Sequence, residues 1–242
     1  MMVSGWVSER TMPLLGVRPG SGFWGSAWVR PVSGQGPAGV RLTNNSCAPA
    51  DIQVNDPVKL CQAEDMGADE TRRLLLLRHA KSAWPDVADS ERPLNDRGRR
   101  DAPVMGRWLR AKGYVPDGVL CSTARRTRDT WALMAGELGA EPPVRYEQRI
   151  YEATALSLLH LLREAGGEHQ TVLLIGHNPG LAELAVGIAQ MVDGPAAEPL
   201  DRVREKFPTA AVAVLDFNGE WADLIPGEAR MVDFAVPRDV PR

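Results

Sequence analysis

The most informative stretch of this chain is LLLLRHAKS, residues 74–82, in which four leucines lead directly into charged and polar residues. A short run that is apolar at every position suits a strand of a parallel sheet, because such a strand is buried on both of its faces. A second run of this kind, VLLI at residues 172–175, leads into GHNPG at residues 176–180. The two runs predict two buried strands of one sheet.

Helical periods separate the predicted strands. Residues 95–112 carry apolar side chains at three- and four-residue steps behind Asn95, a residue type that caps helix N-termini. Asn178 and Pro179 are expected to be the N-cap and the first-turn residue of a later helix. The predicted helices are residues 95–112, residues 123–138, residues 155–162 and a helix that starts at Asn178, and the shorter predicted strands are residues 119–121 and 144–146.

This order of strands and helices predicts an α/β domain of three layers, with a mainly parallel sheet and helices on both of its faces. Towards the end of the chain, Val212, Val214 and Phe217 suggest an alternating strand. Asn218-Gly219 would then form the two-residue turn of a hairpin whose second strand is residues 221–225. The predicted domain covers residues 71–242 and ends in this antiparallel pair.

Residues 1–70 have a different character. Glycine and proline interrupt them so often that no apolar period continues for more than a few residues. We therefore expect a disordered extension, and the alternative is a small folded unit around Trp6, Trp24 and Trp28. The sequence from Met66 onward also looks like a protein start, so Met66 is a candidate for the true first residue.

Composition excludes several classes of protein. The formal net charge is -3, so no overall positive potential would hold nucleic acid or an anionic membrane. Three cysteines at unrelated spacings indicate neither a disulfide framework nor a zinc site. The apolar runs are far shorter than the roughly 20 residues that cross a bilayer, and the N-terminus has no apolar signal core. A cytoplasmic protein is expected.

A histidine follows each of the two strongest predicted strands, His79 after the first and His177 after the second. One such histidine alone would be read as a satisfied polar residue at a strand end. Two in equivalent positions point to a site, because ligands of open α/β sheets bind at the carboxyl ends of the strands. Arg78 and Lys81 add positive charge beside His79, and a helix N-terminus after His177 would offer free N–H groups to an anion. A phosphate-sized pocket is predicted.

A further cation is expected at the same edge of the sheet. The predicted strand at residues 119–121 runs into STARRT, residues 122–127. The helix dipole disfavours arginine in a first turn, so this placement needs another reason. Arg125 is read as a solvated surface residue, and Arg126 as a phosphate ligand.

Four motifs in order resemble the histidine phosphatase (phosphoglycerate mutase-like) superfamily, and among its members the compact SixA-type phosphohistidine phosphatases. The resemblance covers residues 72–242, and it implies the phosphoglycerate mutase-like fold. The matching stretches are RHAKS at residues 78–82, S-x-x-x-R-T-x-x-T at residues 122–130, YEA at residues 151–153 and GHNPG at residues 176–180, with FPTA at residues 207–210 before the last hairpin.

The resemblance implies a covalent mechanism. Neutral His79 would attack phosphorus, and water would later displace the phosphoryl group from the phosphohistidine. Such a step requires no metal or other cofactor. Glu152 is the candidate general acid, although phosphoester-cleaving relatives place their acid in a differently built loop. The residues expected to hold the phosphoryl oxygens are Arg78, Arg126 and His177, and further substrate contacts are expected from Lys81, Ser82 and Asn178.

Three functions remain open on these residues. The first is a phosphatase acting on phosphohistidine of a protein, since an imidazole leaves more easily than an alkoxide. The second is the same chemistry on small phosphate esters, and the third is a phosphate-binding module without turnover. A mutase is disfavoured, because Ala80 stands where mutases usually have glycine and only 51 positions separate Arg126 from His177. The partner is therefore a phosphorylated protein or a small phosphorylated molecule, and the oligomeric state is left open.

Overall fold

The structure is a computed structural model of the chain, and it describes residues 71–241. The predictions for residues 1–70, a disordered extension and a start at Met66, lie outside the described residues. Everything below concerns residues 71–241. No helix in this part of the chain is both long enough and apolar enough to cross a membrane.

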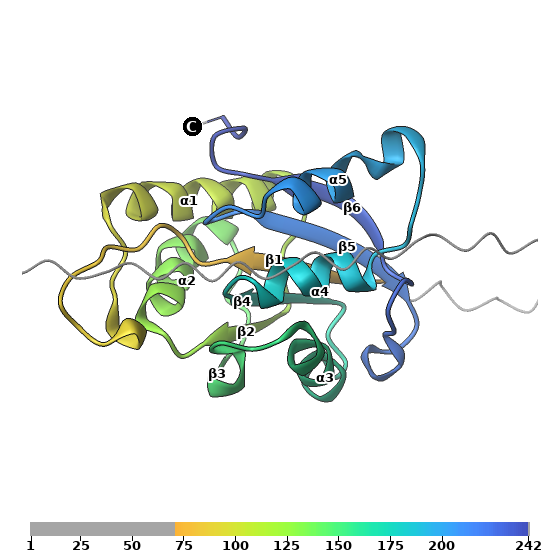
Figure 1. Ribbon diagram of the computed structural model, residues 1–242, viewed down its shortest axis with the longest axis horizontal. Helices are drawn as coiled ribbons and strands as arrows, with labels where there is room; N and C mark the ends of the chain where they lie inside the picture. Colours follow the sequence, from red (N-terminus) through yellow and green to blue (C-terminus); the bar gives the residue numbers. More distant parts are fainter. Residues whose placement is uncertain (1–70, 242) are drawn as a thin grey trace, which may run out of the picture. The chain divides into compact units, whose positions relative to one another are not determined.

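One six-stranded sheet forms the centre of the fold, with the strand order β3-β2-β4-β1-β5-β6 (Figure 1). The pairs β1 with β4, β4 with β2 and β2 with β3 are parallel, whereas β5 is antiparallel to both β1 and β6. The mainly parallel α/β sheet is therefore confirmed. The strands are β1 (Thr71–Arg78), β2 (Gly118–Ser122), β3 (Val144–Glu147), β4 (Thr171–Gly176), β5 (Val212–Asn218) and β6 (Arg230–Ala235).

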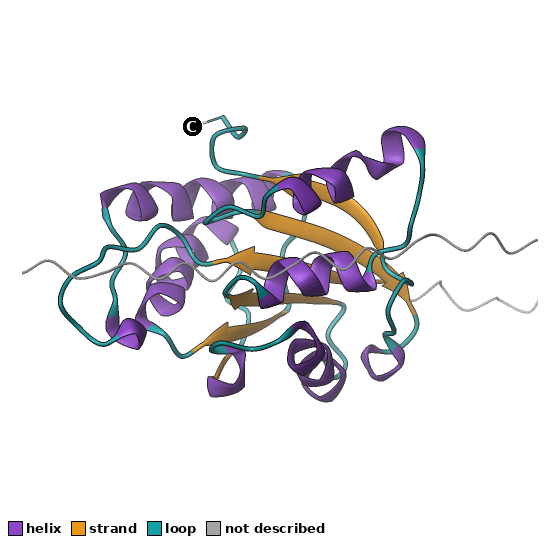
Figure 2. Cartoon of the chain, viewed as in Figure 1, coloured by secondary structure: helices purple, strands orange, loops and turns teal. Residues whose placement is uncertain are grey.

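Helices cover both faces of the sheet and give the predicted three layers (Figure 2). One buried cluster joins the sheet to α1 (Asp96–Ala111) and α2 (Arg125–Leu138). The other joins it to α3 (Ala155–Ala165), α4 (Gly180–Ile188) and α5 (Glu198–Glu205). Short 3-10 helices complete the fold: η1 (Asp89–Glu91), η2 (Gln148–Ile150), η3 (Gly194–Ala197) and η4 (Trp221–Asp223).

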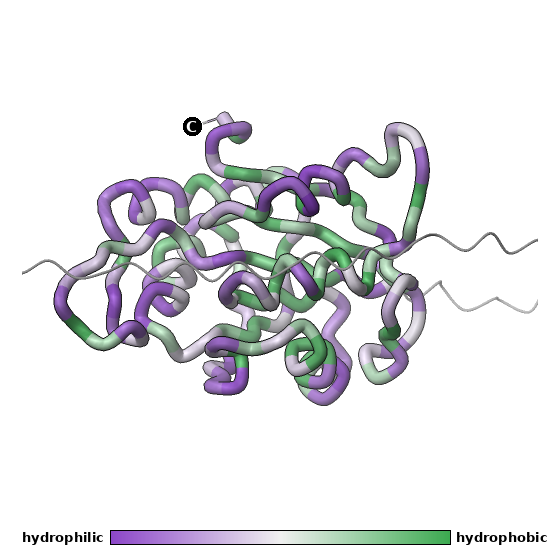
Figure 3. Tube along the Cα trace, viewed as in Figure 1, coloured by the Kyte–Doolittle hydropathy of each residue, from purple (hydrophilic) through white to green (hydrophobic). Residues whose placement is uncertain are grey.

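The leucines of β1 show why its sequence is apolar at every position. Leu75 and Leu77 pack in the cluster under α1 and α2, and Leu74 and Leu76 pack in the cluster on the opposite face. All four are fully buried, which stabilises the fold by about 1.5–3 kcal/mol for each side chain. The strands accordingly form a largely apolar band between more polar helices (Figure 3).

The helix signals in the sequence are mostly confirmed. Asn95 caps α1, since its side chain accepts a hydrogen bond from the Gly98 amide at 2.9 Å. The prediction of Asn178 as a cap is wrong. Pro179 occupies the N-cap of α4, and Asn178 precedes it across a cis peptide bond. The Asn178 amide instead donates to the Phe207 carbonyl at 3.0 Å, so this residue connects the start of α4 to a distant segment.

The C-terminal antiparallel pair is confirmed, but its second strand was predicted in the wrong place. Residues 221–223 form η4, and the partner of β5 is β6, eleven residues beyond Asn218. The reason is Trp221, which is buried against Phe217 and donates its indole N–H to the His169 carbonyl at 2.6 Å. β5 is also buried on both faces rather than alternating. Sequence reasoning missed α5, which buries only Leu200 and Val203.

Candidate active site

The parallel register of β1 and β4 brings the two strand-end histidines together. Arg78 is paired with Gly176 across the two strands, so His79 and His177 leave the sheet side by side. The His79 amide donates to the Gly176 carbonyl at 3.1 Å, and the two imidazole rings are 5.2 Å apart at their centroids. Two side chains almost one hundred positions apart in the sequence thus share one site at the carboxyl edge of the sheet.

His79 is buried and has a defined tautomer. Its Nδ1 is 2.8 Å from the Ala80 carbonyl oxygen, which can only accept, so the neutral ring carries its proton on Nδ1 and leaves a lone pair on Nε2. Burial lowers the pKa of His79 to about 4, and the positive charges of Arg126 and Arg78 act in the same direction. His79 is therefore neutral at pH 7, as a nucleophile must be.

His177 is held by two neighbours. Its Nε2 lies 3.0 Å from the Ser122 hydroxyl, and the edge of its ring meets the ring of Tyr151 at a centroid distance of 5.4 Å. Burial lowers the pKa of His177 to about 3, with further lowering by His79 and Arg126. Its buried Nδ1 has no hydrogen-bond partner within residues 71–241, so one polar atom of the ring is left for a ligand.

Arg78 comes from the end of β1. It donates from Nη1 to the Phe207 carbonyl at 2.8 Å, while its buried Nε has no partner in the described part of the chain. Burial lowers the pKa of Arg78, but the guanidinium keeps its charge at neutral pH. Like His177, it retains an unsatisfied polar atom beside His79, and a phosphoryl oxygen could satisfy it.

Arg126, in the first turn of α2, is buried with only 6 % of its surface exposed. It donates from Nη1 to the backbone carbonyl of Asp89 at 2.6 Å, and its Nη2 lies 3.0 Å from the Asp89 carboxylate. Its guanidinium also lies 5.6 Å from the centroid of the Tyr151 ring. The unfavourable position at a helix N-terminus is thus compensated by a carboxylate.

Asp89, on η1, connects this group of side chains, and sequence reasoning missed it. One carboxylate oxygen accepts from Tyr151 at 2.7 Å and faces Arg126, and the other accepts from Arg92 at 2.9 Å. These hydrogen bonds, that of Tyr151 first, hold the pKa of Asp89 well below its usual range. No local pattern marks Asp89, because its partners lie in other elements.

The threonines of the S-x-x-x-R-T-x-x-T motif have defined tasks. Thr130 accepts from the Ala80 amide at 2.9 Å and donates to the Arg126 carbonyl at 2.6 Å. Since Ala80 also accepts from His79, Thr130 ties the nucleophile loop to the helix that carries Arg126. Thr127 closes the turn before α2 by donating to the carbonyls of Ser122 and Ala124.

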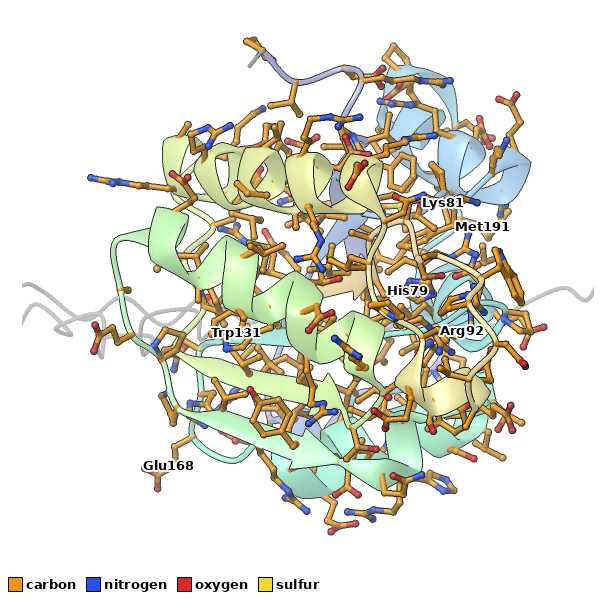
Figure 4. All side chains as sticks on the ribbon, turned by 90° about the vertical axis from the view of Figure 1, so that its left-hand side faces the viewer. His79, Lys81, Arg92, Trp131, Glu168 and Met191 are labelled. Carbon is orange, nitrogen blue, oxygen red and sulfur yellow. The ribbon has the colours of Figure 1, made fainter. Side chains whose placement is uncertain are left out.

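The remaining predicted residues lie around this centre. Ser82 is buried, and its hydroxyl accepts from Arg92 at 2.7 Å. Lys81 is exposed beside Arg78, and Asn178 has a buried Oδ1 without a partner in residues 71–241. Glu152 is exposed at a φ of 56° and forms no hydrogen bond or ion pair with the described residues. His79, Lys81 and Arg92 lie at one side of the molecule, away from Glu168 (Figure 4).

Other reactive side chains do not compete with His79. Cys121 is buried in β2, and burial raises the pKa of its thiol to about 12, so it stays protonated at neutral pH. Within residues 71–241, no group of three or more histidine, cysteine, aspartate or glutamate side chains is arranged to hold a metal ion.

Comparison with known proteins agrees with this geometry. The family model described as the histidine phosphatase superfamily (branch 1) matches residues 74–171. An uncharacterized protein of Mycobacterium tuberculosis is 44% identical over 163 residues, which are 67% of this chain and 100% of the relative. A solved structure of a candidate phosphohistidine phosphatase SixA from Nakamurella multipartitia is 32% identical, with a TM-score of 0.61, and the match covers 69% of this chain and 96% of that one.

A second solved structure, of a candidate SixA from Agrobacterium tumefaciens, is 30% identical with a TM-score of 0.55, and the match covers 69% of this chain and 99% of that one. The fold, the paired histidines and these similarities agree with one another. This chain belongs to branch 1 of the histidine phosphatase superfamily.

Proposed function

We propose that this chain is a phosphatase that forms a covalent phosphohistidine on Nε2 of His79. The observation that carries the proposal is the hydrogen bond from Nδ1 of His79 to the Ala80 carbonyl, because it leaves Nε2 unprotonated in a pocket that contains Arg78 and Arg126. A neutral imidazole surrounded by fixed cations suits attack on a phosphoryl group.

The reaction would proceed in two displacements. The lone pair of Nε2 attacks phosphorus, the bond to the leaving group breaks, and the leaving group keeps the electron pair and takes up a proton. Water then attacks the phosphohistidine, which releases inorganic phosphate and restores the neutral ring. Arg78, Arg126 and His177 would hold the non-bridging oxygens, and fixed donors of this kind supply a few kcal/mol each.

We further propose phosphohistidine of a protein as the substrate. Its leaving imidazole is far less basic than an alkoxide and needs less help from an acid. The acid available to this site is weak: Glu152 is exposed and unpaired within residues 71–241, and Asp89 is held as a carboxylate by Tyr151 and Arg92. The two SixA relatives described above have names that point to the same substrate class. Glu152 remains the predicted acid for an ester.

The test compares a protein that carries phosphohistidine with a panel of phosphate esters, with EDTA present, by measuring kcat/KM for each. We expect the phosphohistidine protein to be the better substrate and His79→Ala to lose at least about a thousandfold in kcat/KM. His160→Ala is the matched control, since His160 is exposed on α3. Unchanged hydrolysis by His79→Ala would refute the nucleophile.

Two other results would replace the proposal. Esters that are hydrolysed orders of magnitude faster than phosphohistidine would make the chain a phosphomonoesterase. Binding of phosphate with no turnover of any substrate would make it a phosphate-recognition module.

A further inference from the structure

A groove begins at Arg78 and extends away from the paired histidines. Its volume is about 550 Å³, within the range of ligand-binding clefts. Six cationic side chains line it and only one acidic side chain, Glu205, does so. The cationic residues are Arg78, Lys81, Arg97, Arg202, Lys206 and Arg238. We call this feature the cationic groove.

Several of these charges are not neutralised. Lys81 and Lys206 form no ion pair within residues 71–241, and both are exposed. Arg238 is 85% exposed and only 3.4 Å from its neighbour Asp239. Arg97 and Arg202 do have carboxylate partners, Arg97 in α1 and Arg202 in α5. Since the whole chain has a formal charge of -3, the groove is a local positive field on a slightly acidic protein.

The groove also has apolar walls. Phe234 and Val236 are buried at the end of β6 and just beyond it, and Pro208 and Pro237 lie beside them. A small anion would need converging donors and would gain nothing from apolar walls. A polypeptide segment that carries both carboxylates and apolar side chains matches both properties.

The cationic groove is continuous with the candidate active site. Arg78 lines the groove and lies beside His79, and its guanidinium donates to the Phe207 carbonyl. Pro208 and Thr209, the next two residues of that segment, line the groove. A polypeptide lying there would therefore pass directly beside the position at which a phosphoryl group would react.

We propose that the cationic groove binds an acidic, partly apolar segment of the phosphorylated protein substrate. This inference rests on the proposed function, since it assigns the surface by which that substrate is recognised. The cations come from the loop after β1, from α1, from α5 and its C-terminal end, and from the segment after β6, and such a spread fits an extended partner.

A charge-reversal variant tests the proposal on the intact chain. The variant is Lys206→Glu with Arg238→Glu, both exposed and outside the catalytic group. The control is Arg100→Glu with Arg230→Glu, which makes the same change in net charge at two exposed positions without ion pairs in residues 71–241. Each protein is assayed with a phosphohistidine protein whose surface near the histidine is acidic, and with an aryl phosphate.

We expect the groove variant to lose about tenfold or more in kcat/KM on the phosphohistidine protein and less than about twofold on the aryl phosphate. Its activity on the protein should also depend less on ionic strength than that of the wild type. The control should stay within about twofold on both substrates. Equal losses in the two variants, or equal losses on the two substrates, would overturn the proposal.

A binding measurement separates this proposal from the proposed function. Fluorescence anisotropy with a fluorescein-labelled peptide of alternating glutamate and leucine reports binding without turnover. We expect the wild type and the control to bind this peptide about tenfold more tightly than the groove variant. If that holds while no phosphorylated substrate is hydrolysed, the groove stands and the phosphatase proposal fails. Equal peptide binding by the groove variant, or stronger competition by inorganic pyrophosphate than by unlabelled peptide, overturns the acidic segment as the occupant.

Discussion

Arg126 and Asp89, from α2 and η1, are joined by two contacts: Nη1 of Arg126 donates to the Asp89 backbone carbonyl at 2.6 Å, and Nη2 lies 3.0 Å from its carboxylate. The same carboxylate accepts from Tyr151 and Arg92. A buried guanidinium that would bind phosphate is therefore held in place before any substrate arrives. Orientation in advance is a main source of catalytic stabilisation for phosphoryl transfer.

Replacing Asp89 should weaken catalysis for every substrate. In Asp89→Asn, an N–H₂ group would face guanidinium donors where an oxygen now accepts, so Arg126 and Arg92 would lose their common anchor. We expect kcat/KM to fall by about ten- to a hundredfold on an aryl phosphate and on a phosphohistidine protein alike. Glu91→Gln, also on η1 and exposed, is the control and should match the wild type. Full activity of Asp89→Asn would refute the anchoring role.

Thr130 should act as a positioning residue for His79. Its hydroxyl accepts from the Ala80 amide, and the Ala80 carbonyl accepts from Nδ1 of His79. Thr130→Val keeps the shape and removes the hydroxyl, so we expect kcat to fall about tenfold with little change in KM. Thr130→Ser keeps the hydroxyl and should recover most of the loss. If Thr130→Ser is as impaired as Thr130→Val, the hydroxyl does not position the nucleophile.

The stability of the protein should fall between pH 7 and pH 4. Unfolded histidine takes up a proton near pH 6.5, whereas burial lowers the pKa of folded His79 to about 4. The unfolded state therefore binds protons first, and the contribution of neutral His79, which is complete above pH 6.5, is lost as pH falls to 4. This difference corresponds to at most about 3 kcal/mol.

Urea unfolding at several pH values checks this prediction. The free energy of unfolding should depend less steeply on pH in His79→Asn than in the wild type. His160→Asn, at an exposed position on α3, should keep the steep dependence. A pH dependence that is the same in all three proteins would show that His79 is not held neutral by burial.

Two glycines of α4 should respond in opposite ways to alanine. A Cβ on Gly180 would lie 2.1 Å from the Ala153 carbonyl oxygen, whereas one on Gly187 would meet nothing within 4 Å. Gly180→Ala should cost about 1–3 kcal/mol of unfolding free energy and reduce activity, because it displaces the start of the helix that follows His177. Gly187→Ala should be neutral or stabilise by up to about 1 kcal/mol. Thermal denaturation of the two variants decides this, and equal stabilities would contradict the close approach.

Much of the fold was predictable because burial on both faces leaves a strong local mark. The leucines of β1 are apolar at every position since alternate side chains enter different clusters, and this pattern is visible without any structure. The hairpin after β5 was misplaced for a related reason. The local turn signal at Asn218-Gly219 suggests an immediate return, but burial of Trp221 takes the chain into η4 first.

The chain order alone was sufficient to propose that His79 and His177 lie together, since residues that follow parallel strands emerge at the same edge of a sheet. It was not sufficient to find Asp89 or the cationic groove. Asp89 becomes informative only when η1 approaches Arg126 and Tyr151, and the groove only when α5 and the end of β6 approach Lys81. Periodicity reports how each residue meets the core, whereas contacts between side chains on separate loops depend on how the whole chain packs, and no local pattern encodes that.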